Sequence, residues 1–401
     1  MKNIRKITDD IVYVGASDRR LALFENIYPI PRGVSYNSYI VLDEKTCLMD
    51  TVDLSVSRQF FENIQAALDG RKLDYLVVHH MEPDHCAMIE DIILRYPEVK
   101  IVGNVKSIQM IKQFYTFDID SRALIVKEGD TLTTGKHSFT FVMAPMVHWP
   151  EVMVSYDSYS GALFSADAFG TFGALSGNIF ADEVEFEKEW LDDARRYFLN
   201  IVGKYGVQTM NLLKKASALD LKMILPLHGP IWRENLGWFI DKHVTWASYE
   251  SETKGALILY GSIYGNTENA ANVLASMLAE RGVKNIHMHD VSSTDQSVLL
   301  AEAFRYSTIV FMSSTYNLEI FTPMAELIQD LKEHLFQNRD VALVENGSWA
   351  LQAGKKMAEA FSSMKNIRFI NDLISIKSTM KDSQISEFEA LADKVAESVL
   401  S

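Results

Sequence analysis

The sequence is poor in cysteine, in long apolar runs and in positive charge. Its 401 residues include only two cysteines, Cys47 and Cys86, which are too few for a disulfide framework. They form no Cys-x-x-Cys pair, which excludes a four-cysteine metal site in this chain. No apolar run approaches the roughly 20 residues that span a bilayer, and the N-terminus has no apolar secretory segment. We therefore expect a soluble, cytoplasmic protein.

The net negative charge of the chain indicates which classes of partner to expect. Acidic residues outnumber basic ones by 53 to 39, and the net charge is -14. Proteins that bind nucleic acid or an anionic membrane usually present a basic surface. We therefore expect no nucleic-acid partner and no membrane partner. A local basic patch for docking another protein remains compatible with this charge.

The most informative stretch is His-His-Met-Glu-Pro-Asp-His at residues 79–85, directly after the apolar run 76–78. An apolar run bounded by proline and polar residues predicts a buried strand that ends in a loop. Four potential metal ligands then share one small space: His80, Glu82, Asp84 and His85. Two imidazole–carboxylate pairs exceed what one four-coordinate metal usually takes from one loop. The stretch therefore predicts a two-metal site.

Three further apolar runs each end in a potential ligand. Residues 143–148, 162–167 and 223–228 end in His148, Asp167 and His228. Each run predicts a strand that delivers one side chain at its carboxyl end, where loops build sites. The prediction is thus a set of seven ligands. Six histidines lack this placement, and we interpret them as solvated or hydrogen-bonded: His79, His137, His243, His287, His289 and His334.

The order His-x-Glu-x-Asp-His, followed by His148, Asp167 and His228, resembles the flavodiiron proteins, a branch of the metallo-β-lactamase fold. The resemblance implies one iron on His80, Glu82 and His148, a second iron on Asp84, His85 and His228, and Asp167 bridging both. It implies no catalytic residue beyond these ligands. Glu82 stands where zinc hydrolases of this fold typically carry a third loop histidine. A carboxylate there makes the site harder, which favours iron.

Length and composition support two to three domains, with the best boundary in the polar stretch 247–254. Before it, predicted strands form two groups, residues 12–15, 38–42, 47–50 and 75–79, then 100–103, 139–143, 152–156 and 162–165. After it, five strands alternate with helices, which indicates a doubly wound parallel sheet. With the resemblance, we expect a metallo-β-lactamase-like αββα sandwich at 1–250 and a flavodoxin-like five-stranded domain at 254–401.

Three loops of the C-terminal half follow predicted strands. The first loop, with Gly265 before a helix, suits a phosphate, although it lacks the Gly-Lys-Ser/Thr ending of a Walker loop. It resembles the phosphate loop of flavodoxins, and the other two loops stand where such domains contact the flavin ring. The resemblance implies an FMN site formed by Ser262, Ile263, Tyr264, Gly265, Asn266, Thr267, Ser314, Thr315, Tyr316, Asn317, Asn346, Gly347, Ser348 and Trp349. Trp349 either stacks on the ring or packs in the core. The third loop is poorer in glycine than the family pattern, so flavin affinity stays open.

The resemblance also implies an activity. In such a protein FMN passes electrons to two non-haem irons, which reduce dioxygen to water, nitric oxide to nitrous oxide, or both. A separate donor brings the electrons, and rubredoxin, a reduced deazaflavin and a flavin reductase all remain open. The implied assembly is a head-to-tail homodimer, or a dimer of dimers, with the flavin of one chain facing the irons of its partner.

Two other functions remain open at the sequence level. A zinc-dependent hydrolase of the metallo-β-lactamase fold, fused to a flavodoxin-like module, would use the metal to activate water. Glu82 and the paired flavin loops count against it. A non-catalytic electron carrier with a vestigial metal site is the other, and the complete set of seven ligands counts against that.

Overall fold

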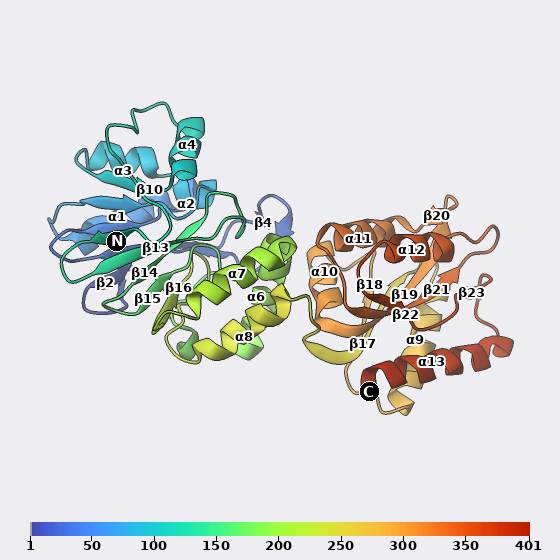
Figure 1. The fold of residues 1–401 in the computed structure, drawn as a ribbon. Coiled ribbons are helices and arrows are strands. Elements are labelled where there is room, and N and C mark those ends of the chain that lie inside the picture. The colour runs from blue at the N-terminus through green and yellow to red at the C-terminus, as the bar shows by residue number, and fades with distance from the viewer. Residues whose placement is uncertain (1) are drawn as a thin grey trace. The chain divides into compact units, whose positions relative to one another are not determined.

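Figure 1 shows the computed structural model of the chain, which describes residues 2–401. Contacts divide the chain into two units, Met1–Val244 and Thr245–Ser401. Helix α8 (Leu236–Ala247) ends where the polar stretch begins, and strand β17 (Thr253–Gly261) starts at its end. Between residues 2 and 401, no helix combines the length and apolar character needed to cross a membrane.

The N-terminal unit contains two large sheets (Figure 1). Helices α3 (Ile89–Arg95) and α4 (Val105–Phe114) lie beyond one sheet, and α6 (Leu191–Tyr197), α7 (Gly206–Ala216) and α8 lie beyond the other. The first sheet has the order β1 (Arg5–Lys6), β2 (Ile11–Tyr13), β7 (Tyr39–Val41), β8 (Cys47–Met49), β9 (Tyr75–Val77), β10 (Lys100–Gly103) and β11 (Ala123–Ile125). The second has the order β12 (Thr131–Thr133), β13 (Ser138–Met143), β14 (Met153–Asp157), β15 (Ala162–Phe164) and β16 (Met223–Leu225). This is the expected αββα sandwich.

One predicted grouping of strands is wrong. Residues 100–103 form β10, which pairs in parallel with β9 in the first sheet and not with the second group. The segment between β9 and β10 holds helices α2 (Pro83–Cys86) and α3 (Ile89–Arg95). A strand–helix–strand crossover returns the chain to the same sheet, which explains the parallel pairing.

Helices and short hairpins complete this unit. Two of its helices are α1 (Ser57–Leu68) and α4 (Val105–Phe114). Residues 186–205 form an interrupted helical segment, whose pieces are α5 (Phe186–Glu189), α6 (Leu191–Tyr197), a π-helical turn (Phe198–Val202) and a 3-10 turn (Gly203–Tyr205). Helix α7 (Gly206–Ala216) follows. Two small sheets were not foreseen, β3 (Ala16–Asp18) with β6 (Val34–Tyr36), and β4 (Leu23–Phe24) with β5 (Tyr28–Pro29).

The C-terminal unit is a doubly wound parallel sheet. Its order is β18 (Ile286–Asp290), β17, β19 (Tyr306–Tyr316), β21 (Arg339–Asn346) and β22 (Ile367–Phe369), all parallel. Strands β20 (Glu319–Ile320) and β23 (Ile374–Ile376) pair beside this path. Helices α9 (Asn266–Glu280) and α13 (Ile385–Leu400) lie on one face, and α10 (Gln296–Arg305), α11 (Thr322–Glu333) and α12 (Ala353–Ser362) lie on the other (Figure 1). In chain order the strands run 2-1-3-4-5, the flavodoxin-like order.

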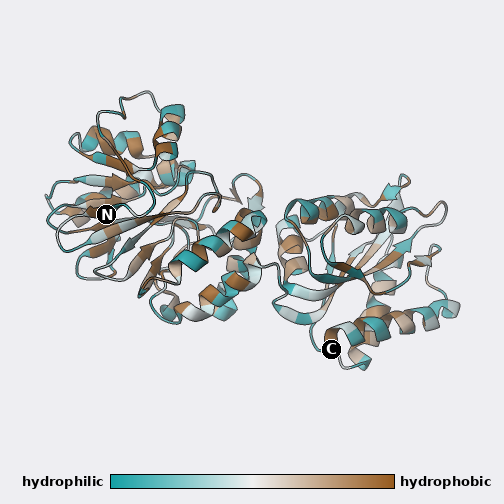
Figure 2. Ribbon diagram, in the orientation of Figure 1, coloured by the Kyte–Doolittle hydropathy of each residue, from teal (hydrophilic) through white to brown (hydrophobic). Residues whose placement is uncertain are grey.

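The core follows the alternation of apolar and polar residues. Figure 2 shows the hydrophobic residues concentrated on the strands and on the inner helix faces of each unit. In the C-terminal unit, residues of β17, β19 and β21 pack with α9 and α13 in one buried cluster. This rigid layer fixes the loops at the carboxyl ends of β17, β19 and β21, where ligands bind in such sheets.

Candidate metal centre and flavin pocket

The first metal-ligand loop begins where β9 ends. Strand β9 lies between β8 and β10 and pairs in parallel with both. Pro83 occupies the first turn of α2, where its fixed φ suits a helix start. Asp84 and His85 lie in this single turn, and Glu82 immediately precedes it. The loop that carries the ligands is therefore fixed at one end by β9 and at the other end by α2.

The structure brings all seven predicted ligands together in two adjoining groups. The first group is His80, Glu82, His148 and Asp167, and the second is Asp84, His85 and His228. Glu82 Oε2 lies 3.2 Å from His80 Nε2 and 3.1 Å from His148 Nε2. Asp84 Oδ2 lies 3.3 Å from the Nε2 atoms of both His85 and His228. Within each group, the imidazole nitrogens therefore face a shared carboxylate.

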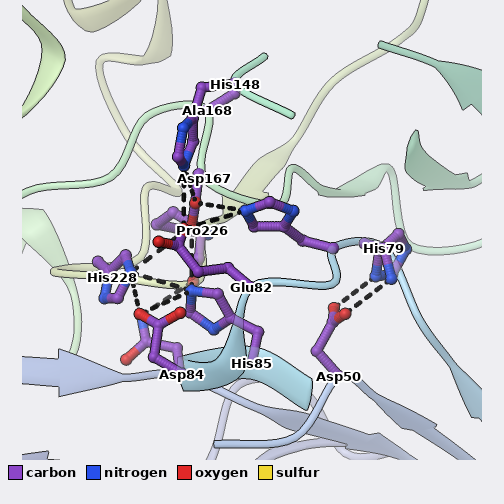
Figure 3. Close-up of polar contacts among 12 residues, drawn as sticks. Asp50, His79, Glu82, Asp84, His85, His148, Asp167, Ala168, Pro226 and His228 are labelled. Atoms are coloured by element: carbon purple, nitrogen blue, oxygen red, sulfur yellow. Dashed lines mark hydrogen bonds and ion pairs between the residues drawn. The ribbon is translucent and has the colours of Figure 1, made fainter. Parts of the chain in front are cut away.

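Asp167 faces both groups, as Figure 3 shows. Its Oδ2 lies 3.3 Å from His80 Nε2 and 3.2 Å from His148 Nε2. Its Oδ1 lies 3.2 Å from His85 Nε2 and 3.6 Å from His228 Nε2. One carboxylate thus turns one oxygen to each group, which is the geometry of a bridging ligand.

Two histidines are oriented by partners behind the centre. His80 Nδ1 pairs with Glu151 Oε1 at 2.8 Å, and His228 Nδ1 pairs with the Ser35 carbonyl at 2.7 Å. Each Nδ1–H donates to its oxygen, so Nε2 is the nitrogen that turns to the centre. Such outer partners fix the tautomer of metal-binding histidines. Sequence reasoning missed Glu151, because it lies in the loop before β14, 71 residues from His80.

The charges at the centre fit bound cations. Asp84 and Asp167 are buried, and neither carboxylate has a hydrogen-bond partner among the described residues. Burial raises the pKa of Asp167, but the charges of His85 and His80 outweigh it and hold this pKa well below its usual value. Burial lowers the pKa of His148, while Asp167 and Glu82 raise it to about 9. Buried carboxylates without donors cost free energy, and metal ions would satisfy them.

Left-handed backbone places several of the ligands. Ala166, just before Asp167, has φ 51°, and Met146, two residues before His148, has φ 64°. Gly229, just after His228, has φ 76°. Non-glycine residues in this region carry strain and cluster at functional sites. The strand ends therefore turn sharply to aim their side chains at the centre.

Aromatic rings surround the ligands. The Trp149 ring lies edge-on to His80 with centroids 5.3 Å apart, and the Tyr197 ring lies 5.5 Å from that of His228. The Tyr197 hydroxyl is buried and has no hydrogen-bond partner in the described part of the chain. Burial, followed by the charges of Asp167 and Asp84, raises the pKa of Tyr197 well above its usual value. Tyr197 is therefore a neutral donor beside the metal ligands.

The three remaining histidines of the N-terminal unit are hydrogen-bonded, as expected. His79 turns away from the centre and pairs with Asp50 Oδ2 at 2.6 Å and with Ser155 Oγ at 2.7 Å (Figure 3). His137 Nδ1 lies 2.7 Å from Asp157 Oδ2, and His243 Nδ1 lies 2.9 Å from the Phe239 carbonyl. These three therefore support the fold.

The C-terminal unit has a cavity of about 340 Å³ at the carboxyl ends of β17, β19 and β21. Thirteen of the fourteen predicted flavin residues line it: Ser262, Ile263, Tyr264, Asn266, Thr267, Ser314, Thr315, Tyr316, Asn317, Asn346, Gly347, Ser348 and Trp349. Gly265, the fourteenth, has φ 87° and caps the N-terminus of α9. Trp349 is 72% exposed, so the alternative that it packs in the core is wrong.

Hydrogen bonds hold these loops together. The Ser262 hydroxyl accepts from the Gly265 N–H, and the hydroxyls of Thr267 and Ser314 lie 3.1 Å apart. Asn346 Nδ2 donates to Thr267, and its buried Oδ1 has no partner among residues 2–401. A helix N-terminus beside such hydroxyls suits a phosphate, and the exposed aromatic suits a planar ring. The residues present therefore fit FMN.

Two lining residues were missed by sequence reasoning, Leu318 and Ser378. Ser378 follows β23, a strand that was not expected, and its carbonyl accepts from Asn346 Nδ2. Leu318 follows Asn317 in a turn between β19 and β20, and both residues have positive φ. A turn signal at Asn317 was the clue available for Leu318.

Comparisons with known proteins agree with this geometry. The family model described as ODP family beta lactamase matches residues 34–229, and the flavodoxin family model matches residues 258–396. A nitric oxide reductase of Moorella thermoacetica is 32% identical over 328 residues, 81% of each chain. An anaerobic nitric oxide reductase flavorubredoxin of Klebsiella pneumoniae is 29% identical over 86% of this chain and 72% of its own.

Solved structures extend the similarity to the whole chain. The rubredoxin oxygen:oxidoreductase of Desulfovibrio gigas superposes with a TM-score of 0.91 at 28% identity, over 99% of this chain and 98% of its own. A flavodiiron protein of Giardia intestinalis superposes with a TM-score of 0.93 at 22% identity, over 100% of this chain and 97% of its own, and so shares the fold.

Proposed function

The chain belongs to the flavodiiron protein family, and from this premise we propose how its own residues carry out the reaction. The protein is an oxidoreductase that reduces dioxygen, nitric oxide or both at a non-haem di-iron site, with electrons relayed through FMN. The observation that carries the proposal is Asp167, whose two oxygens face two separate ligand groups within one buried centre.

We assign the ligands by these groups. His80, Glu82 and His148 would hold one iron, and Asp84, His85 and His228 would hold the other. Asp167, with one oxygen facing each group, would bind both. When bound, the ferrous pair supplies electrons to a diatomic gas. The three carboxylates offset the cationic charge, and the seven buried ligands hold the pair out of bulk water.

The surrounding residues position the centre and can move a proton. Glu151 and Ser35 hold the Nε2 atoms of His80 and His228 toward the centre. The Tyr197 hydroxyl is neutral and has no hydrogen-bond partner among residues 2–401, so it would donate a hydrogen bond into the centre. Water forms in either reaction, so protons must reach the centre as electrons do.

In the flavin pocket, we assign the phosphate of FMN to the N-terminus of α9 with Ser262 and Thr267. Trp349 and Tyr316, both exposed on the pocket wall, cover the ring. When bound there, FMN would supply a relay for electrons, taken singly or in pairs, between a separate donor and the di-iron site. Rubredoxin is the donor that the name of the Desulfovibrio gigas protein suggests, and nitric oxide is the gas that the Moorella and Klebsiella names suggest.

We propose a cytoplasmic head-to-tail homodimer. The metal ligands lie between residues 80 and 228, and the flavin loops lie between residues 262 and 378, in separate units. Electron transfer falls steeply with distance, and a two-fold pair can set the flavin of one chain against the irons of its partner. Exposed apolar residues occur beside both sites, Tyr264 and Trp349 at the pocket and Leu23 and Ile27 on the β4–β5 hairpin. Phe24 of that hairpin packs on His228.

A steady-state assay tests the function. Purified protein with iron and FMN is supplied with electrons by NADH, a rubredoxin reductase and rubredoxin, and the loss of nitric oxide or dioxygen is followed with gas electrodes. We expect consumption of at least one gas, abolished in Asp167→Ala. A protein that holds two zinc ions after growth with ample iron, consumes neither gas and hydrolyses esters would instead be the zinc hydrolase.

A further inference from the structure

A third group of potential metal ligands lies in the C-terminal unit. His287 and His289 are two residues apart on β18, so both side chains leave the same face of the strand. Glu302 comes from α10. One potential ligand atom from each of the three residues lies within 4.8 Å of the others. None of the three lines the flavin cavity.

His289 has an unsatisfied polar atom. Its Nε2 is buried and has no hydrogen-bond partner among residues 2–401, so the interpretation of His289 as solvated or hydrogen-bonded is wrong for this nitrogen. A buried polar atom without a partner costs free energy and is rare in folded proteins. Burial lowers the pKa of His289 and outweighs the opposing charge of Glu302. The ring is therefore neutral near pH 7, the form that binds metals.

The side chains of His287 and Glu302 differ in their exposure to water. His287 is exposed, and its ring lies 5.3 Å from that of Tyr306. Glu302 is largely buried, and its Oε1 accepts from Arg305 Nη1 at 3.1 Å. Arg305 satisfies only part of the carboxylate, which has two oxygens. The three side chains thus come together at the edge strand of the sheet, where His287 is exposed to water.

We propose that His287, His289 and Glu302 bind one divalent ion of the zinc class. Two imidazoles and one carboxylate are a set that zinc accepts, and an open fourth position is filled by water. With one carboxylate instead of three, this set is softer than the di-iron centre and favours zinc over iron.

The expected consequence is a link between two elements. Strand β18 is the edge of the sheet and pairs only with β17 along the main path. An ion held by β18 and α10 fastens the edge strand to a helix on one face of the sheet. Unprotected edge strands are sites of unwanted pairing, so the ion stabilises the exposed border of the flavodoxin-like unit.

Zinc titration of the full-length protein loaded with iron and FMN tests the site. Zn²⁺ is added in competition with a chromophoric chelator, and iron and flavin are measured afterwards to show that both are retained. We expect one Zn²⁺ per chain beyond the iron. His289→Ala and His287→Ala should each weaken zinc binding at least about tenfold, the lower limit seen even for outer partners of metal sites.

A matched histidine serves as the control. His334 is the C-cap residue of α11 and is not in the group, and His334→Ala should bind zinc as the natural protein does. Glu302→Gln should weaken zinc binding but leave both imidazole nitrogens as ligands. With Cu²⁺ bound in place of zinc, electron paramagnetic resonance would detect these two nitrogens. Retained FMN colour shows that each variant is folded. Absence of the extra zinc, or equal binding in the His287→Ala/His289→Ala double variant, overturns the proposal.

Discussion

Glu151 makes the two ligand groups chemically unequal. It presents a carboxylate to His80 Nδ1, whereas His228 Nδ1 donates to the neutral Ser35 carbonyl. A carboxylate partner raises the basicity of a metal-binding imidazole. The iron beside His80 should therefore be the more stable of the two in the ferric form.

Replacing Glu151 by glutamine keeps an acceptor for His80 and removes the charge. We expect Glu151→Gln to retain iron and to raise the reduction potential of one iron, by about 59 mV for each tenfold loss of preference for the ferric state. A redox titration followed by Mössbauer spectroscopy of ⁵⁷Fe measures this shift. Glu151→Asp, which restores the charge, should return the potential toward the natural value, and equal potentials in all three proteins would contradict the assignment.

His148 links iron binding to pH. Burial lowers its pKa, but Asp167 and Glu82 raise it to about 9 in the metal-free protein, above the ordinary value of 6.5. Iron must displace this proton, so the affinity of the metal-free protein for ferrous ion should fall about tenfold per pH unit per displaced proton below pH 9. The folding stability of the metal-free protein changes in the opposite direction. The interaction of protonated His148 with Asp167 and Glu82 contributes fully below pH 6.5, and its contribution is lost as the pH rises through 9.

Chelator competition between pH 6 and 9 measures the affinity, and thermal unfolding of the metal-free protein measures the stability. An affinity for iron that is independent of pH over this range would show that His148 is already neutral before the metal binds.

At the scale of elements, the sequence predicted the strand ends well. Apolar runs that end in a polar residue led to His80, Asp167 and His228, because a buried strand in a sandwich reads as a short hydrophobic stretch. The sheet to which β10 belongs was predicted wrongly, since strand pairing depends on contacts that local pattern does not contain. Glu151 and Ser378 were missed for the same reason, because both act through partners more than 30 residues away.

The turn after β16 gives an element-scale prediction. Gly229 has φ +76°, and an added Cβ would lie 2.0 Å from Thr171 Cγ2. Gly229→Ala should displace His228 and lose iron from the second group. Gly70 is the control, because it has φ +84° but open space around the added Cβ. Gly70→Ala should cost about 1 kcal/mol of stability from backbone strain and keep both irons. Iron analysis and melting curves separate the two variants, and full iron content in Gly229→Ala would count against the placement of His228.

At the scale of the whole molecule, local patterns predict two cofactor sites on separate units, whereas the proposed meeting of the two sites in a dimer comes from the family resemblance alone. Each unit has its own strands and core, which local patterning reveals. The approach of the sites depends on assembly, and no pattern within one chain encodes it directly.

Complementation between two inactive chains tests the proposed dimer. One chain carries Asp167→Ala, and the other carries Ser262→Ala with Trp349→Ala. Each mixed dimer should recover up to about one half of the natural activity, because one of its two shared sites is intact, and a 1:1 mixture that pairs at random should therefore recover about one quarter. Each parent mixed with itself should stay inactive. Full activity of the natural protein as a monomer in sedimentation at assay concentration would rule the shared site out.

The most direct test of the central claim is a single turnover with counted electrons. Protein with about two irons and one FMN per chain is reduced without oxygen, freed of reductant and mixed with dioxygen or nitric oxide. Two ferrous ions and reduced FMN hold about four electrons, so we expect about one dioxygen taken to water without peroxide, or about two nitrous oxide molecules, per chain. Flavin reoxidation should accompany either product and should be slow in Asp167→Ala. Three results together would contradict a di-iron reductase. The flavin would be reoxidised equally fast in the natural protein and in Asp167→Ala, nitric oxide would give no nitrous oxide, and dioxygen would give peroxide.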